Sequence, residues 1–171
     1  MSGRTIGEFF PSMLHIRAAT VQDVGLLRNM ICELAEYERQ LDLVSIREQD
    51  LARDGFGVNP RFRALIAEWD GHPAGYALFF GFYSTWVGHG LFLEDLFVRE
   101  AFRRRGIGQA LLAAVAQIAV AEHGYGIQWE VLDWNEKAIQ LYKQLGATFR
   151  DQWRPVLLAD EALRRLAEKA R

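Results

Sequence analysis

The feature that most constrains the fold of this chain is the segment at residues 91–98, which is apolar except for two adjacent carboxylates, Glu94 and Asp95. A continuous apolar run of this length is typical of a strand that is covered on both faces. Placing an ionised carboxylate in such a strand without a partner costs on the order of several kcal/mol. We therefore expect the two acids to have a functional reason for their position.

A basic turn and a helix follow this strand. Residues 103–105 are all arginines, Gly106 and Gly108 come next, and residues 107–120 form an apolar run with helical character. Glycines allow backbone N–H groups to approach a ligand closely, and a helix N-terminus carries about half a positive charge. The strand, turn and helix together predict a cradle for a phosphate group.

The segment does not match the sequence motifs of two other glycine-rich phosphate-binding loops. A dinucleotide-binding loop requires a third glycine, and Leu111 stands at that position. A P-loop requires a lysine and a hydroxyl residue after its last glycine, where this chain has Gln109 and Ala110. From this stretch alone, an ordinary strand-to-helix turn with solvated arginines remains open as an alternative.

Composition limits the classes of partner. The chain has 171 residues, half of them hydrophobic, and a net charge of −2, so we expect one domain and no nucleic-acid or membrane partner. Cys32 is the single cysteine, which excludes an internal disulfide and fits a reducing, cytoplasmic compartment. No apolar run is long enough to span a membrane. The four histidines are scattered without ligand spacing, so we expect no metal site.

Hydrophobic periodicity gives the order of the elements. Residues 1–13 have no clear period and are expected to be a loose extension before a single domain at 14–171. The order β-α-α-β-β-β-α-β-α-β-β plus a C-terminal helix predicts an α/β fold with a mixed sheet flanked by helices. The expected strands lie at 14–17, 62–69, 74–83, 91–98, 127–132, 147–150 and 153–158, and the later helices at 107–120, 137–145 and 160–169.

Several capping signals mark helix ends. Thr20 with Asp23, and Ser45 with Glu48, are spaced as capping boxes for the first two helices. Asn135 is expected to be the N-cap of the helix at 137–145, and Gly146 follows its last residue. Asp160 is expected to cap the final helix. Asp70 and Gly71 predict a tight hairpin turn.

Arg103, Gly106 and Gly108 fit the motif R/Q-x-x-G-x-G/A, and the chain resembles the GCN5-related N-acetyltransferase (GNAT) superfamily over nearly its full length. Within that superfamily it is most similar to the diamine (spermidine/spermine) and thialysine acetyltransferases. Short matches carry this closer resemblance, and they occur in one order at residues 16–20, 33–38, 54–57, 93–95, 106–108, 134–136, 142–143 and 146–147.

The resemblance implies direct transfer of an acetyl group from acetyl-CoA to a primary amine. An alkyl amine has a pKa near about 10 and must lose a proton before it attacks, and Glu94 matches the position of the family's base. A backbone N–H near Leu96, after a bulge in the strand, would stabilise the oxyanion. Tyr142 matches the general acid that protonates the departing thiolate, although periodicity alone equally favours a core tyrosine.

The resemblance also implies a set of ligand contacts and a homodimer. The pantetheine and pyrophosphate of the cofactor would contact Leu96, Phe97, Val98, Arg103, Arg104, Arg105, Gly106, Ile107, Gly108, Gln109, Asn135 and Ala138. The amine would contact Tyr37, Glu38, Trp86, Glu94 and Asp95. For Trp86, packing on the core is an equally good interpretation of a loop aromatic.

Two departures from the polyamine pattern favour a small substrate. Ser84 stands where diamine enzymes have an aspartate before Trp86, and only Asp151 and Gln152 stand in place of a longer acidic segment. Fewer acids attract a multivalent cation less strongly, so a lysine-like amino acid, thialysine or a short diamine is the preferred substrate. A polyamine acetyltransferase and a catalytically inactive acetyl-CoA-binding regulatory module are the alternatives.

Overall fold

A computed structural model describes residues 13–170 of the chain. Their contacts divide them into two units, residues 13–130 and residues 131–170. Most of the predicted N-terminal extension lies outside the described residues, and the prediction of a single domain at 14–171 stays a prediction.

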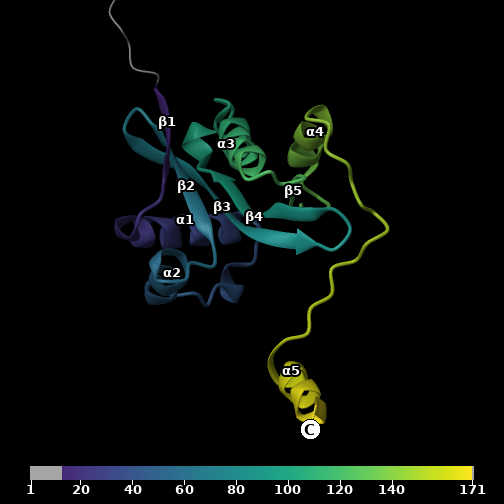
Figure 1. The fold of residues 1–171 in the computed structure, drawn as a ribbon. Helices are drawn as coiled ribbons and strands as arrows, with labels where there is room; N and C mark the ends of the chain where they lie inside the picture. The colour runs from purple at the N-terminus through teal and green to yellow at the C-terminus, as the bar shows by residue number, and fades with distance from the viewer. Residues whose placement is uncertain (1–12, 171) are drawn as a thin grey trace, which may run out of the picture. The chain divides into compact units, whose positions relative to one another are not determined.

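The first unit is built on a five-stranded mixed sheet (Figure 1). The strand order follows the chain, and neighbouring strands are antiparallel except β5, which runs parallel to β4. This arrangement confirms the predicted fold class. The strands are β1 (Leu14–Ala18), β2 (Arg63–Trp69), β3 (His72–Ser84), β4 (Gly88–Val98) and β5 (Ile127–Gln128).

The hairpin between β2 and β3 forms for the reason that the sequence indicates. Asp70 and Gly71 both adopt positive φ angles, 51° and 74°. A two-residue turn with two left-handed residues matches the twist of the flanking strands, and Asp-Gly is a favoured pair for it. The predicted turn is therefore confirmed.

Helices cover both faces of this sheet. Figure 1 shows α1 and α2 on one face and α3 on the other. The helical elements of this unit are η1 (Val21–Asp23), α1 (Val24–Tyr37), η2 (Leu41–Leu43), α2 (Glu48–Phe56), η3 (Glu100–Phe102) and α3 (Ile107–Ala121).

One of the two predicted capping boxes is confirmed and the other is wrong. The Asp23 carboxylate accepts a 2.8 Å hydrogen bond from the Thr20 backbone N–H, as expected. The second helix starts later than predicted, because Arg47, not Ser45, is the N-cap of α2. The Asp50 carboxylate accepts from the Arg47 Nε at 2.8 Å and from its backbone N–H, which fixes the first turn at that point.

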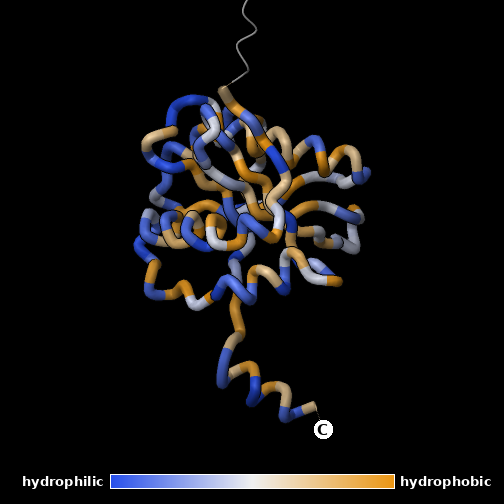
Figure 2. The backbone as a smooth tube through the Cα atoms, turned by 90° about the vertical axis from the view of Figure 1, so that its left-hand side faces the viewer, coloured by the Kyte–Doolittle hydropathy of each residue, from blue (hydrophilic) through white to orange (hydrophobic). Residues whose placement is uncertain are grey.

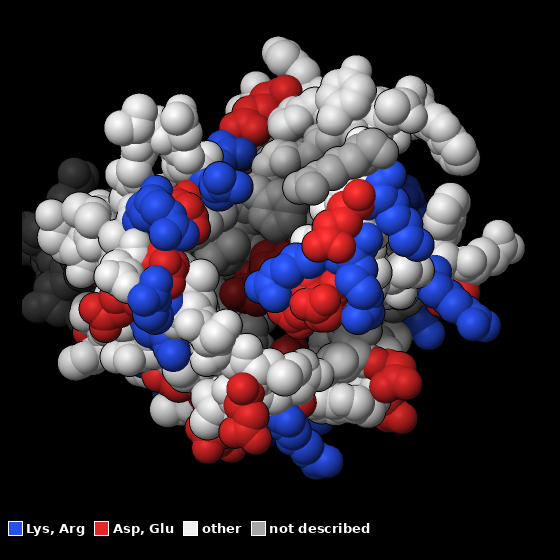
Figure 3. Space-filling model, turned by 90° about the horizontal axis from the view of Figure 1, so that it is seen from below, with Lys and Arg blue, Asp and Glu red and all other residues white. Residues whose placement is uncertain are grey.

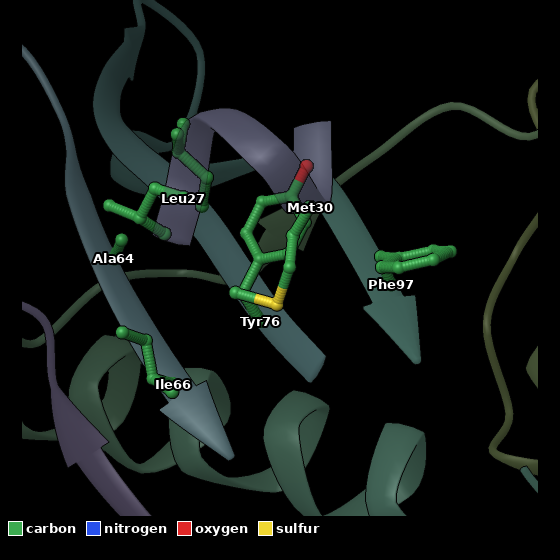
Figure 4. Packing of buried hydrophobic residues seen from close by; sticks show 7 residues of the cluster. Leu27, Met30, Ala64, Ile66, Tyr76 and Phe97 are labelled. Carbon is green, nitrogen blue, oxygen red and sulfur yellow. The ribbon is translucent and has the colours of Figure 1, made fainter. Parts of the chain in front are cut away.

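The core under α1 combines one helix with three strands (Figure 4). Successive side chains of a strand point to opposite faces of the sheet, so each strand contributes every second side chain to this core. The cluster consists of Leu27, Met30, Ala64, Ile66, Tyr76, Leu78 and Phe97.

The second unit contains α4 (Glu136–Gln144), α5 (Asp160–Ala167) and η4 (Glu168–Ala170). The two strands predicted at 147–150 and 153–158 are wrong, because residues 145–159 contain no strand. An isolated segment gains little from extended geometry without a partner strand, and Trp153, Val156 and Leu157 are all exposed. The predicted strand at 127–132 likewise shortens to the two residues of β5.

The C-terminal helix forms as predicted but with a different cap. Asp160 is its first residue, with a φ of +52°, and Ala159 is the N-cap. Hydrophobic residues recur every three to four positions along α5, as at Leu163 and Leu166, with hydrophilic residues between them (Figure 2), which makes the helix amphipathic.

Candidate active site

The two carboxylates of β4 lie at a β-bulge. Leu78 of β3 pairs with Asp95, and the next residue, Phe79, pairs with Leu93, so Glu94 has no partner opposite it. A bulge reverses which face of the sheet the following side chains occupy. Leu93 therefore shares the α3 face with Phe79, whereas Asp95 lies on the α1 face. The bulge expected near this position is confirmed.

The Asp95 carboxylate lies in a largely buried environment. The Tyr76 hydroxyl donates a 2.9 Å hydrogen bond to Asp95 Oδ2. Burial raises the pKa of Asp95 to about 6, and repulsion from Glu94 and Glu38 acts in the same direction, while the Tyr76 hydrogen bond opposes it. An aspartate with this pKa is mostly ionised at neutral pH and attracts a cation.

A third carboxylate, Glu38, comes from the residue directly after α1. Burial raises its pKa, and its charge acts on both Tyr76 and Asp95. Within residues 13–170, none of Glu38, Glu94 and Asp95 forms an ion pair with a basic side chain. The structure thus brings together three predicted substrate residues as an acidic cluster without a counter-charge.

The loop between β4 and α3 has the backbone geometry of an anion cradle. Arg104 and Gly106 have positive φ angles of 62° and 77°, and Gly106 is the N-cap of α3. The first N–H groups of a helix have no acceptor within the helix and point toward its N-terminal end. Left-handed residues followed by this helix start therefore present several N–H groups that fit a pyrophosphate.

Two of the three arginines in this loop contact other parts of the protein. Arg103 Nε donates to the Val98 carbonyl at 3.0 Å, and its guanidinium lies 4.7 Å from the centre of the Tyr37 ring. Arg105 lies over Trp69, at 5.1 Å. The role of these side chains toward pyrophosphate stays a prediction. No signal in the sequence indicates the contact between Arg103 and Tyr37, which are far apart in the chain.

The backbone of β4 has an open edge beside this loop. Only Leu91 and Phe92 of β4 pair with β5, so in the described unit 13–130 the β5 ladder ends before Leu93. An unpaired strand edge presents alternating N–H and C=O groups to an extended ligand. Residues 96–98 lie on this stretch, so its geometry fits the amides of a pantetheine arm.

Trp86, predicted to line the substrate pocket, lies in the turn between β3 and β4. Its side chain is 85% exposed, and its backbone N–H donates to Ser84 Oγ at 3.3 Å. The ring is largely exposed to solvent, and its substrate contact stays a prediction.

In the second unit, three predicted residues follow one face of α4. Asn135 caps the helix, as predicted, by accepting a 3.3 Å hydrogen bond from the Ala138 N–H. Tyr142 lies two turns from the cap, with 8% of its surface exposed. Burial raises the pKa of Tyr142, which keeps its hydroxyl protonated at neutral pH. Gly146 follows the helix with a φ of +81°, as predicted.

Comparison with known proteins identifies the family. The profile of the acetyltransferase (GNAT) family matches residues 27–147. A thialysine N-epsilon-acetyltransferase of Sus scrofa is 42% identical over 165 residues, which cover 90% of this chain and 97% of that protein. A spermidine/spermine N(1)-acetyltransferase-like protein 1 of Homo sapiens is 36% identical over 139 residues, covering 77% of this chain and 20% of that protein.

Solved structures show the same fold. An integron cassette protein of V.cholerae has a TM-score of 0.75 at 22% identity, covering 91% of this chain and 98% of its own. An aminoglycoside N-acetyltransferase in complex with CoA has a TM-score of 0.68 at 19% identity, covering 90% of this chain and 98% of its own. The chain belongs to the GNAT acetyltransferase family. It is an acetyl-CoA-dependent N-acetyltransferase.

The described residues bear on metal ligands, membrane-spanning helices and surface charge. They contain no group of three or more His, Cys, Asp or Glu side chains placed to hold a metal ion. Across residues 13–170, no helix combines the length and the apolar character needed to cross a membrane. Acidic and basic side chains are interspersed on the face seen in Figure 3.

Proposed function

We propose that this enzyme acetylates the side-chain amine of a lysine-like amino acid, with thialysine as the first candidate. The observation that carries the proposal is the acidic cluster of Glu38, Glu94 and Asp95, which has no basic partner in the described residues. Such a cluster attracts an ammonium group to the open edge of β4. The 42% identity to a thialysine N-epsilon-acetyltransferase supports an amino-acid substrate.

In the proposed reaction, Glu94 accepts the proton of the substrate ammonium, directly or through a water. Glu94 suits this role because it is the exposed residue at the bulge. The neutral amine then attacks the thioester carbonyl, forming the C–N bond, and the backbone N–H near Leu96 stabilises the oxyanion. The C–S bond breaks, and the Tyr142 hydroxyl gives its proton to the thiolate. The second proton of the attacking nitrogen then passes to the Tyr142 phenolate, directly or through a water, which leaves the neutral amide and restores the hydroxyl. The buried, protonated state of Tyr142 supports this role.

The cofactor contacts are part of the same proposal. Gly106 and the start of α3 hold the pyrophosphate through backbone N–H groups, together with residues 103–105 and 107–109. The edge of β4 at residues 96–98 pairs with the pantetheine amides, and Asn135 with Ala138 contacts the same arm. The left-handed backbone at Arg104 and Gly106 supports the first contact, and the early end of the β5 ladder supports the second.

The experiment is CoA release from acetyl-CoA by the purified full chain with thialysine, lysine, short diamines, spermidine, spermine and a peptide amine. We expect the highest kcat/KM for a small amino acid. Tyr142→Phe and Glu94→Gln should each lower kcat by about a hundredfold or more, because each removes one proton-transfer group. A clear preference for spermine over every small amine would replace the proposal with a polyamine acetyltransferase, which the human relative also supports. Acetyl-CoA binding without turnover on any amine would favour the regulatory module.

We also propose a cytoplasmic homodimer that has no nucleic-acid or membrane partner. The exposed apolar side chains of the second unit, among them Trp153, Leu157 and Leu163, support a protein contact there. The single cysteine supports a cytoplasmic location, and the net charge of −2 supports the absence of nucleic-acid and membrane partners. Light scattering after gel filtration tests the dimer, cell fractionation tests the compartment, and filter or vesicle binding tests the excluded partners. A monomer at micromolar concentration would contradict the dimer.

A further inference from the structure

Tyr76 carries a hydroxyl group that core packing does not require. Its side chain is fully buried in the cluster beneath α1, with the ring centre 6.2 Å from that of Phe97 (Figure 4). A phenylalanine ring would fill the same space without bringing a polar group into an apolar core. Burial of such a group is unfavourable unless it forms a hydrogen bond. The hydroxyl forms that bond with Asp95.

The bulge makes this contact possible. Tyr76 pairs with Phe97 across β3 and β4, and Leu78 pairs with Asp95, so Tyr76 and Asp95 are diagonal neighbours on one face. Without the extra residue Glu94, the alternation of β4 would place Asp95 on the α3 face, away from Tyr76. The bulge and the hydroxyl together therefore determine where the Asp95 carboxylate lies.

The hydrogen bond uses only one oxygen of the carboxylate. Oδ2 accepts from Tyr76, and among the described residues no group donates to Oδ1. The groups that act on Asp95 are Tyr76 from β3, Glu94 from β4 and Glu38 from the end of α1, and both glutamates oppose its ionisation. Burial and the neighbouring Asp95 raise the pKa of Tyr76 well above its usual value, so its hydroxyl remains a donor.

We propose that Tyr76 is a positioning residue for amine recognition, which holds the Asp95 carboxylate so that Oδ1 receives the substrate ammonium. This inference rests on the proposed function and deepens it, because it assigns amine affinity to a residue that does not touch the substrate. The hydroxyl favours the ionised form of Asp95 against two neighbouring negative charges. Its loss leaves the carboxylate less ionised and free to rotate.

The test compares Tyr76→Phe with Tyr83→Phe, a matched control on the same strand whose side chain is 74% exposed. We expect Tyr76→Phe to raise the KM for the amine by about tenfold, since a hydrogen bond to a charged group is lost. The affinity for acetyl-CoA and the maximal kcat at high pH should stay close to those of the wild type. The acidic limb of the profile of kcat/KM against pH should move to higher pH. Tyr83→Phe should change none of these quantities.

A double-variant comparison separates positioning from general damage. Asp95→Asn should raise KM at least as much as Tyr76→Phe, and the two effects should not add in the double variant, because both act through one carboxylate. Wild-type KM and an unchanged acidic limb in Tyr76→Phe would overturn the inference. Effects that add fully in the double variant would also overturn it.

Different results would contradict the proposed amine acetylation and the positioning role of Tyr76. If the wild type acetylates no amine, the proposed function fails, and carbon-13 NMR titration of the Asp95 carboxyl then decides the positioning role. We expect Asp95 to titrate at higher pH in Tyr76→Phe than in the wild type and in Tyr83→Phe. Identical titration in all three proteins would overturn the inference whatever the substrate.

Discussion

Gly106 and Gly71 offer a matched test of the anion cradle. Their φ angles are +77° and +74°, and a Cβ added at either position would meet no heavy atom within 4 Å. An L-residue held in the left-handed conformation costs about 1–2 kcal/mol. We therefore expect Gly106→Ala and Gly71→Ala to lower the free energy of unfolding by the same amount. In a chain of this size the melting temperature should fall by roughly 2–8 °C in each variant.

The two variants should differ in ligand binding. Gly71 lies in the β2–β3 turn, whereas Gly106 is the N-cap of α3, where the N–H groups are proposed to hold pyrophosphate. Isothermal titration should give an acetyl-CoA Kd about tenfold or more higher for Gly106→Ala, which corresponds to about 1.4 kcal/mol. Gly71→Ala should bind as the wild type does. If Gly106→Ala bound acetyl-CoA with wild-type affinity, the assignment of the cradle to this backbone would be refuted.

Further predictions concern stability and follow from local geometry. Gly108→Ala should leave the melting temperature unchanged or raise it, because its Cβ would lie 3.6 Å from the Val98 side chain, an ordinary contact, and alanine favours a helix; thermal melts followed by circular dichroism check this. Leu27→Ala should cost about 2–5 kcal/mol in urea unfolding, because the side chain is fully buried. Arg17 lowers the pKa of Asp23 to about 2, so the ion pair stabilises the fold above about pH 4. The stability difference between the wild type and Asp23→Asn should therefore shrink as the pH falls from about 4 toward 2, and a constant difference would contradict the ion pair.

Local patterns predicted those parts of the fold that depend on local interactions. The apolar run of β4, the glycine at the start of α3, the turn at Asp70 and Gly71 and the cap at Asn135 each follow from a few neighbouring residues. The strands expected at 147–150 and 153–158 do not form, because strand formation depends on a partner strand, which local alternation does not reveal. The predicted start of α2 at Ser45 was wrong because Asp50, rather than Glu48, is the capping carboxylate and accepts hydrogen bonds from Arg47.

The candidate site was predictable to a similar extent. The resemblance pointed to Glu38, Glu94 and Asp95, and the structure brings them together. Tyr76 was not predicted, because in sequence it is one more aromatic residue of an apolar strand. Its partner is 19 positions away and reaches it only through the bulge at Glu94, and a change of register is not visible in a pattern of alternation. The contact of Arg103 with Tyr37 was missed for the same kind of reason.

That contact of Arg103 has a thermodynamic consequence. The Arg103 guanidinium donates a hydrogen bond to Val98, the last residue of β4, and lies over the ring of Tyr37, the last residue of α1. Arg103 therefore connects the proposed pyrophosphate loop to the residue directly before Glu38. A ligand that alters this contact from one end therefore also acts on the residues at the other end. Reciprocity then requires that any factor by which acetyl-CoA tightens the binding of the amine equals the factor by which the amine tightens the binding of acetyl-CoA.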